Sequence, residues 1–313
     1  MKKSSKRWSK FRKEFKRDWQ LLVMVLIPVI YLLIFSYGSM YGVQVAFRDY
    51  RPRAGITGST WVGLQWFVKF LSSPKFFAVL KNTVVLSLYS LLVNFPLPII
   101  FALMLHALRS DKYKRTVQVI SYIPHFISTA VIVSLIQMVL SPVSGIYGMM
   151  FRLFNDGGYP MDFRGSAGAF RHIYVWSSVW QGLGWGTIIY TSALAGVSQE
   201  LHEAAQIDGA SRFKRIIHID IPAIMPMICM RLILTFSSII SVGFDKAYML
   251  QTDLNVSVSE VVSTYVYKNG LNSFKNFSYG TAVGLFNTAI NLTLMFIVNG
   301  ITKKMSQDEV SLF

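Results

Sequence analysis

Six long apolar segments constrain the fold more than any other feature of this chain. A helix needs about 20 mainly apolar residues to cross the hydrocarbon core of a bilayer. Each segment meets that length, and a single soluble core could not bury all of them. The sequence therefore predicts an all-α integral membrane protein with six transmembrane helices, at 20–41, 77–107, 117–140, 171–196, 223–250 and 278–301.

The composition fits this class and excludes others. Only 15% of the residues are charged, whereas a soluble domain carries about 25%. Cys229 is the single cysteine, so an intrachain disulfide is excluded. His202 and Glu203 begin the zinc-protease pattern HExxH, but Gln206 stands where the second histidine ligand should be. Neither a metalloprotease nor a metal site is therefore expected.

The basic residues flank the apolar segments and thereby predict an orientation. Lysines and arginines crowd into 2–17, recur at 109–115, and return at Lys303 and Lys304. Basic residues mark the cytoplasmic side of membrane proteins, so both termini are predicted to be cytoplasmic. The net charge of +16 is attributed to this topology and to anionic membrane lipid, and no nucleic-acid partner is expected. The loops that this orientation places outside are 44–75, 142–170 and 252–276.

Residues 1–19 are predicted to form a cytoplasmic, basic, amphipathic tail. Trp8, Phe11, Phe15 and Trp19 recur at spacings of three and four residues among the cations. This pattern places the rings on one face of a cationic helix that could lie on the inner leaflet. A simple positive anchor is the alternative.

Prolines inside two of the predicted spans indicate bends. Pro96 and Pro98 are expected to kink the second span. Pro124 opens the hydrogen-bond ladder of the third span, next to His125, which could titrate near neutral pH. We interpret this position as a structural kink, with proton coupling as the alternative.

A polar, helix-prone stretch at 198–222 lies between the fourth and fifth apolar segments. Glu-Ala-Ala at 203–205 favours a helix, and Gly209 permits a sharp turn. Pro222 ends a second short helix before the next apolar segment. Two short helices joined at an angle would form a compact projection whose small residues another protein could approach closely. An ordinary interfacial loop is the alternative.

The spacing within this stretch resembles the EAA loop in permease subunits of bacterial ABC importers. Glu-Ala-Ala, Gly209, Ile219 and Pro222 match the pattern, and Ile221 departs from its usual leucine. The resemblance implies a type I, MetI-like permease fold and a loop that docks on a cytoplasmic ATPase. The residues implied in that coupling are Glu203, Ala204, Ala205, Asp208, Gly209, Phe213, Ile219 and Pro222.

Longer stretches narrow the resemblance to a subfamily. QVISYIPHFIS at 118–128 and SYGTAVGLFNTAINLTLMFIVN at 278–299 resemble the LplB-type permeases of the carbohydrate-uptake group, which are associated with oligosaccharides and polysaccharide fragments. The domains expected on this basis are the first transmembrane helix at 20–41, an extracellular loop at 42–76, a five-helix permease core at 77–301 and a cytoplasmic tail at 302–313.

The resemblance also implies partners. They are a second homologous permease, two ATP-binding cassette subunits, an extracellular substrate-binding lipoprotein and an oligosaccharide substrate. The sequence contains no GxxxxGK[ST] phosphate loop, so the chain is not expected to be an enzyme or to hold a cofactor. ATP and Mg²⁺ would be bound by the partner ATPases. The rival classes are a secondary transporter driven by an ion gradient and a non-transporting membrane scaffold.

Polar and aromatic side chains inside the spans are the candidates for a sugar pathway. Polar groups within a membrane are costly, and they face a cavity or another helix. Hydroxyl and amide groups suit sugar hydroxyls, and aromatic rings suit the apolar faces of sugar rings. Packing between helices is the alternative role, and Arg231 is interpreted as snorkelling to the cytoplasmic surface. The candidates are Asn82, Trp180, Trp185, Thr187, Ser238, Phe244, Asp245, Tyr248, Asn287 and Asn291.

Overall fold

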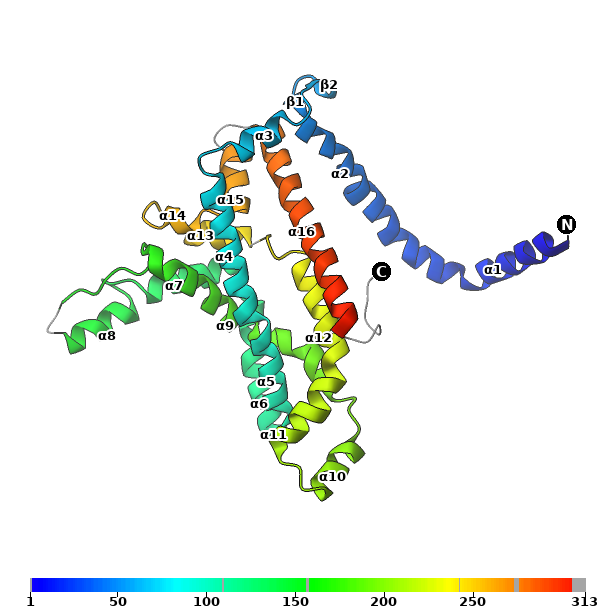
Figure 1. Cartoon of the computed structure of the whole chain (residues 1–313), viewed down its shortest axis with the longest axis vertical. Coiled ribbons are helices and arrows are strands. Elements are labelled where there is room, and N and C mark those ends of the chain that lie inside the picture. Colours follow the sequence, from blue (N-terminus) through cyan, green and yellow to red (C-terminus); the bar gives the residue numbers. More distant parts are fainter. Residues whose placement is uncertain (1, 109, 156–157, 242, 273–275, 306–313) are drawn as a thin grey trace.

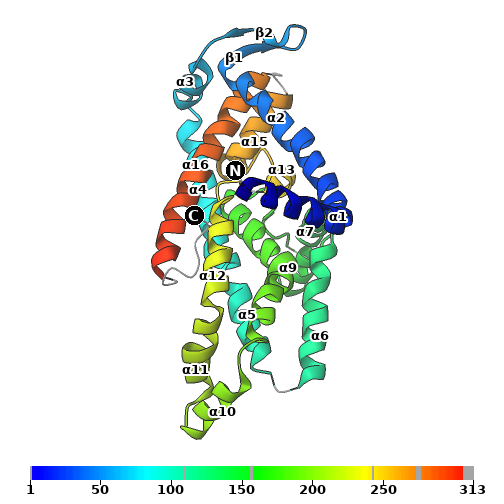
Figure 2. The same cartoon turned by 90° about the vertical axis from the view of Figure 1, so that its right-hand side faces the viewer.

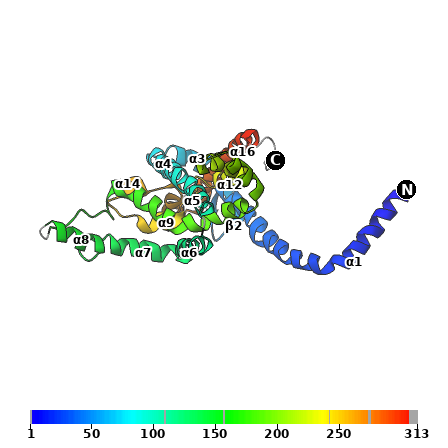
Figure 3. The ribbon, with the colours of Figure 1, turned by 90° about the horizontal axis from the view of Figure 1, so that it is seen from below.

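The computed structural model describes residues 2–108, 110–155, 158–241, 243–272 and 276–305. An elongated helical bundle is flanked on one side by a long N-terminal helical arm and on the other by a short helix (Figure 1). Seen from below, the arm and the short helix extend in opposite directions from the bundle (Figure 3). The predicted tail at 302–313 lies mostly outside the described residues.

The arm begins with α1 (Lys2–Tyr31) and continues through η1 (Leu32–Tyr37) and α2 (Gly38–Met40). It ends in the 3-10 helix η2 (Tyr41–Phe47), which packs against the last helix of the chain. No residue in the most apolar stretch of this arm is buried by the rest of the chain. Its apolar surface is therefore available to lipid or to another protein.

A small β-hairpin follows the arm, so the all-α prediction was wrong at this point. Strands β1 (Arg48–Arg51) and β2 (Gly55–Trp61) pair antiparallel, with Arg48 opposite Trp61. The backbone N–H of Arg51 donates to the hydroxyl of Ser59 at 3.0 Å, which fixes the turn end of the hairpin. Strand β1 has only four residues, and β2 contains Gly55 and Gly58, so neither gives a clear periodic signal and the sequence suggested only a polar loop.

The second predicted span is present as a pair of consecutive helices. After α3 (Gln65–Leu71), α4 (Phe76–Asn94) and α5 (Pro96–His106) run end to end with only Phe95 between them. Pro96 occupies the first turn of α5, where its missing N–H leaves no broken hydrogen bond. The long apolar run therefore continues across the prolines.

The third predicted span, 117–140, is not one straight helix. Helix α6 (Asp111–Tyr122) leads through η3 (Ile123–Phe126) to α7 (Thr129–Val139), and the two parts are bent by 99°. Pro124 removes a backbone donor, and the hydroxyl of Ser128 caps the new helix by accepting from the N–H of Val131. The sequence predicted a kink here, and the structure shows a turn close to a right angle.

The centre of the bundle is α9 (Ala167–Leu194), which follows the laterally extended α8 (Ile146–Phe154). Helix α9 packs against α4, α5 and α6, and against a later helix, α12. Phe170, Tyr174, Tyr190 and Leu194 are fully or nearly fully buried along it. This helix therefore links the two ends of the core.

The chain then forms the polar projection and returns to the bundle. Helix α10 (Gln199–Ile207) and the short α11 (Arg212–Arg215) make the projection at one end of the molecule (Figures 1 and 2). A π-helix, η4 (Ile216–Asp220), leads into α12 (Ile221–Phe236). Pro222 lies in the first turn of α12 rather than between two separate helices.

The fifth predicted span, 223–250, was wrong as a continuous helix. Helix α12 ends at Phe236, and α13 (Phe244–Leu250) begins after a turn. The hydroxyl of Ser237 donates to the backbone carbonyl of Leu234 at 2.7 Å, which competes with the helical ladder at this point. The apolar composition of the segment concealed this break.

The last elements lie at the opposite end from the projection, with α16 returning along the bundle (Figure 1). They are α14 (Val256–Ser259), α15 (Val262–Val266), η5 (Tyr267–Asn272) and α16 (Phe277–Met305). Four helical runs among the described residues are long and apolar enough to cross a membrane, or up to five if the bent third segment is one span. The six-span topology and the cytoplasmic termini remain predictions.

Candidate functional site

A cavity of about 350 Å³ lies between α4, α5, α9 and the end of α12. Hydroxyl, amide and aromatic groups occur on its wall together with a single guanidinium among the described lining residues. Such a mixture can bind a polyhydroxylated ligand through both hydrogen bonds and ring faces. The polar and aromatic lining residues are Ser87, Ser90, Asn94, Phe95, Tyr174, Tyr190, Arg231, Thr235, Ser238 and Ser241.

Three of the predicted pathway residues meet at the turn that follows α12. Ser238 lines the cavity itself. The side-chain amide of Asn291 accepts from the backbone N–H of Ile240 at 3.0 Å and donates to the hydroxyl of Ser241 at 2.9 Å. The amide of Asn287 also donates to Ser241, at a longer 3.4 Å. Asn287 and Asn291 therefore hold the cavity wall in place from α16.

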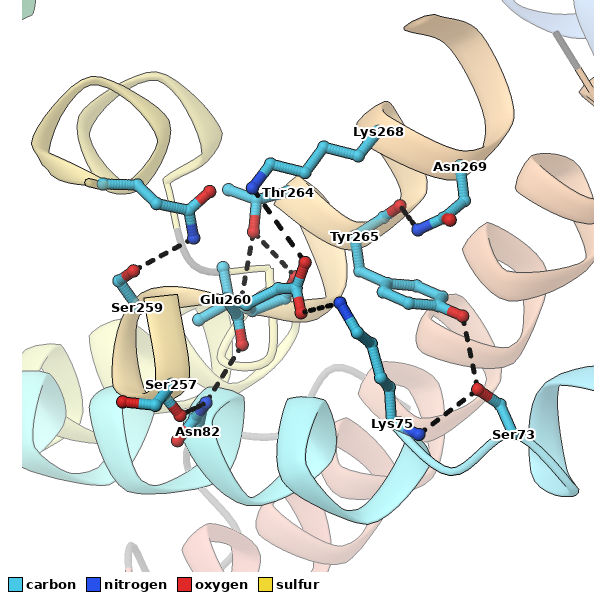
Figure 4. A network of polar contacts seen from close by, with 12 residues as sticks. Ser73, Lys75, Asn82, Ser257, Ser259, Glu260, Thr264, Tyr265, Lys268 and Asn269 are labelled. Carbon is cyan, nitrogen blue, oxygen red and sulfur yellow. Dashed lines mark hydrogen bonds and ion pairs between the residues drawn. The ribbon is translucent and has the colours of Figure 1, made fainter. Parts of the chain in front are cut away.

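Two other predicted residues make buried contacts away from this cavity. The hydroxyl of Thr187 donates to the backbone carbonyl of Gly184 within α9. The amide of Asn82 donates to the backbone carbonyls of Ser257 and Glu260, at 2.8 and 3.2 Å (Figure 4). Asn82 thus ties α4 to α14 and to Glu260, the residue that follows α14.

The predicted aromatic residues lie in separate places. Trp180 is half exposed, and Trp185 stacks on His125 with ring centroids 4.3 Å apart. Phe244 and Tyr248 stack on each other at 5.3 Å, beside Tyr267. Asp245 is exposed on the same short helix. The structure therefore groups Phe244 with Tyr248, but none of these five predicted residues lines the cavity.

Several lining residues were not among the sequence candidates. Ser87, Ser90 and Asn94 follow one another at spacings of three and four residues on α4, a helical stripe that the sequence already contained. Nothing in the sequence distinguishes Tyr174 and Tyr190 from other aromatic residues of the apolar segments. Arg231, interpreted from the sequence as snorkelling, lies in the cavity wall.

The polar projection has the geometry of two capped helices joined by a sharp turn. The hydroxyl of Ser198 accepts from the N–H of Glu200 at the start of α10, and Ser211 caps α11 in the same way. Gly209 adopts a left-handed backbone conformation, with φ of 76°. A residue with a side chain is strained there, so glycine fixes the angle between the helices.

The predicted coupling residues mostly face outward on this projection. Glu203, Ala204, Asp208 and Phe213 are exposed, as is Gly209. Ala205 and Ile219 are partly buried beneath them, and Pro222 is exposed at the start of α12. The nearby Ile207 is 87% exposed, which is costly for an isoleucine in water. The projection therefore exposes the apolar side chains of Ile207 and Phe213 among polar groups.

One group of potential metal ligands lies at the base of the projection. His106, His202 and Asp220 each place a ligand atom within 4.8 Å of the others.

The loop that follows α8 carries an ion pair. The guanidinium of Arg164 lies 2.7 Å from a carboxylate oxygen of Asp162. Hydrogen bonds from Arg164 hold the pKa of Asp162 below its ordinary value. The carbonyl of Arg164 in turn accepts from the buried amide of Asn255 at 3.2 Å, so this loop is fastened to the segment before α14.

Comparison with known families identifies the class of membrane protein to which the chain belongs. The sequence profile described as "Binding-protein-dependent transport system inner membrane component" matches residues 94–307. The chain belongs to this family. It is therefore a permease subunit of ABC importers in a bacterial membrane and not an enzyme, because the ATPase of such importers is a separate subunit.

Full-length relatives agree with this assignment. The permease is 40% identical to Protein LplB of Bacillus subtilis (strain 168) over 293 residues, which covers 94% of this chain and 91% of LplB. It is also 40% identical, over 290 residues, to the polygalacturonan/rhamnogalacturonan transport system permease protein YteP of the same organism, covering 93% of this chain and 89% of YteP. The resemblance stated from the sequence is thus confirmed.

A solved structure shares the fold. The crystal structure of a bacterial ABC transporter involved in the import of the acidic polysaccharide alginate contains a chain that matches with a TM-score of 0.85 and 34% identity. The match covers 95% of the permease and 99% of that chain. The MetI-like permease fold is therefore supported over nearly the whole length.

Proposed function

We propose that this permease forms half of the translocation pathway of an ATP-driven importer for oligosaccharides or polysaccharide fragments. The observation that carries the proposal is the cavity beside α9, whose serines, Asn94 and tyrosines match the groups that bind sugars. The relatives support the substrate class, because YteP is named for polygalacturonan transport and the structural neighbour for alginate import.

The charge of the cavity favours an acidic sugar. Arg231 is the only charged residue among the described lining residues, and no carboxylate opposes it there. The guanidinium of Arg231 is exposed in this wall and can pair with a carboxylate of the substrate. An oligosaccharide that contains uronic acid units fits this wall better than a neutral one.

The expected partners are a second homologous permease, two ATP-binding cassette subunits and an extracellular binding lipoprotein. The exposed apolar arm formed by α1 supplies a surface for the membrane and for a neighbouring permease. A structural neighbour forms a complex with a periplasmic protein bound to an alginate pentasaccharide, which supports delivery of the sugar by a binding protein. ATP and Mg²⁺ belong to the ATPase subunits.

The polar projection formed by α10 and α11, hereafter the EAA projection because it carries Glu-Ala-Ala at 203–205, is proposed to carry the motion of the ATPase into the membrane. Ile207 and Phe213 provide apolar contacts at its surface, and Gly209 sets the angle between its two helices. Because α12 begins directly after η4, a displacement of the projection moves α12 and, with it, the cavity wall at Ser238. Closure of the ATPases on ATP would then switch the pathway from inward-open to outward-open, and hydrolysis would reset it.

The first test is a gentle affinity purification of the chain from its native membrane. Recovery of an ATPase, a second permease and a lipid-anchored binding protein is expected. The binding protein can then be screened with acidic and neutral oligosaccharides. Recovery of the chain alone, still moving solute in vesicles without ATP, would replace this proposal with the gradient-driven transporter. Inhibition of uptake by vanadate rather than by an ionophore separates the same two classes.

A further inference from the structure

Two histidines and an aspartate converge where the EAA projection joins the bundle. His106 is the last residue of α5, His202 lies in α10, and Asp220 ends the π-helix before α12. A carboxylate oxygen of Asp220 is 3.1 Å from Nε2 of His202 and 3.8 Å from Nε2 of His106. The sequence showed only half of a zinc-protease pattern at His202. The other two members of the cluster, His106 and Asp220, lie outside that pattern and meet His202 only in the folded chain.

Asp220 is the buried member of the cluster, and the two histidines are partly buried. Asp220 is only 3% exposed. Its Oδ1 atom and Nε2 of His202 lie 3.1 Å apart, and neither has a hydrogen bond of good geometry to any described residue. Leaving buried polar atoms unpaired is costly, and a bound cation would engage both.

The distances suit a tetrahedral metal ion. Ligand atoms about 2.0–2.2 Å from a tetrahedral Zn²⁺ lie roughly 3.3–3.6 Å from one another. The separations of 3.1 and 3.8 Å from Asp220 Oδ1 bracket that value. All three ligand atoms lie within 4.8 Å of one another, so small side-chain rotations can bring them around one ion. Two imidazoles and a carboxylate are a donor set that Zn²⁺ and related ions accept, with a fourth position left for water.

Space for the fourth ligand is present. A cavity of about 350 Å³ borders the cluster and is also lined by Gln199 and Gln206. Arg212 and Arg215 lie on the same wall and reduce the affinity for a cation. The guanidinium of Arg215 is directed to the side-chain oxygen of Gln206 at 3.3 Å and to the backbone carbonyl of His202 at 3.5 Å.

We propose that His106, His202 and Asp220 bind a divalent transition-metal ion of the zinc class. The ion would fasten α10 to the end of α5 and to the start of α12. These are the joints about which the projection must turn if it transmits motion, so bound metal would hold it in one orientation. The proposal of metal binding is based on the geometry of the cluster alone. The proposed effect of the metal on coupling also rests on the proposed function.

The test uses the intact importer complex, purified in detergent through a tag that contains no histidine. Co²⁺ is titrated in as a visible probe, because its absorption reports coordination by imidazole and carboxylate. One Co²⁺ per permease chain that Zn²⁺ displaces is expected. The variants His106→Gln, His202→Gln and Asp220→Asn should each weaken binding at least about tenfold.

His218→Gln is the matched control. His218 lies two residues from Asp220 on the same π-helix, but it is exposed and its Nδ1 faces the carbonyl of Lys214 at 2.9 Å. This variant should bind Co²⁺ as the wild type does. Equal binding by the wild type and Asp220→Asn, or an equal loss in His218→Gln, would overturn the site. Thermal midpoints measured without metal establish that the variants are folded.

Measuring ATPase activity tests whether metal bound at this site also affects coupling. Zn²⁺ should lower transport-linked ATPase activity in the wild type and leave Asp220→Asn unchanged. Absence of Co²⁺ binding, together with a pH dependence of activity that His202→Gln removes, would overturn the metal site in favour of a protonated cluster. The Co²⁺ titration does not depend on transport. Its result can therefore be interpreted even if the proposed import function is wrong.

Discussion

The side-chain amide of Asn291 donates to the hydroxyl of Ser241 at 2.9 Å, across the gap between α16 and the turn that ends α12. The same side chain accepts from the buried N–H of Ile240 at 3.0 Å. Without Asn291 that N–H would have no helical partner, because the ladder of α12 has already ended. One residue of α16 therefore shapes the cavity wall that carries Ser238 and Ser241.

We expect Asn291→Ala to lower the stability of the permease by about 1–3 kcal/mol, because it leaves a buried donor unpaired. Asn287→Ala is the matched control, since its hydrogen bond to Ser241 is longer, at 3.4 Å. It should cost well under half as much. Thermal unfolding in detergent measures both, and uptake by Asn291→Ala should fall with the distorted wall. Equal destabilisation by the two variants would contradict this account.

Arg231 should determine preference for substrate charge. Its guanidinium is the only charge on the described cavity wall. We expect Arg231→Gln to reduce uptake of an acidic oligosaccharide about tenfold or more, the effect of removing one charge-assisted hydrogen bond. Arg231→Lys should retain part of the activity because it keeps the charge. The measurement is competition between acidic and neutral oligosaccharides in proteoliposomes, and an equal loss for both would argue for a purely structural role.

Gly209→Asp should insert and assemble normally but fail to couple ATP hydrolysis to uptake. A side chain at φ of 76° is strained by roughly 1–2 kcal/mol, which is enough to change the angle between α10 and α11. Gly196→Ala is the control, because Gly196 follows α9 without a positive φ. Transport at the wild-type rate by Gly209→Asp would contradict the proposal that the projection couples ATP hydrolysis to uptake. The readouts are membrane yield, ATPase activity and uptake.

The projection was predictable from sequence because its information is local. Ser198, Gly209, Ser211 and Pro222 each act within a few residues, through a cap, a turn or a ring without an N–H. Their spacing along the chain is therefore also their arrangement in space. This is why the family could be recognised from one short segment.

The cavity and the cluster of His106, His202 and Asp220 could not be predicted from local sequence, because their residues come from separate parts of the chain. Periodicity showed which polar residues share a helix face, as Ser87, Ser90 and Asn94 do, but not which faces meet. The turn after Phe236 is held by the side-chain amide of Asn291 from α16, whereas apolar composition alone suggested that the helix continued. Asp220 likewise meets His106 only because α5 and the segment before α12 pack together.

The last prediction concerns the polar network at the opposite end from the projection. The ammonium of Lys75 lies 3.1 Å from the carboxylate of Glu260, and that of Lys268 lies 4.0 Å away (Figure 4). Glu260 is only 8% exposed, whereas the side chain of Lys75 is 61% exposed. Loss of the ion pair therefore costs more free energy for the buried Glu260 carboxylate than for the exposed Lys75 ammonium.

We expect Lys75→Met to lower stability by about 1–3 kcal/mol, because a mostly buried carboxylate keeps only its weaker partner, Lys268. Glu260→Gln should cost less, about 1 kcal/mol, since Lys75 can return to water. The double variant should lose less than the two single losses added together. Lys81→Met, at an exposed lysine of α4 outside this network, controls for the loss of a surface charge. Strict additivity in thermal unfolding would mean that Lys75 and Glu260 do not stabilise each other.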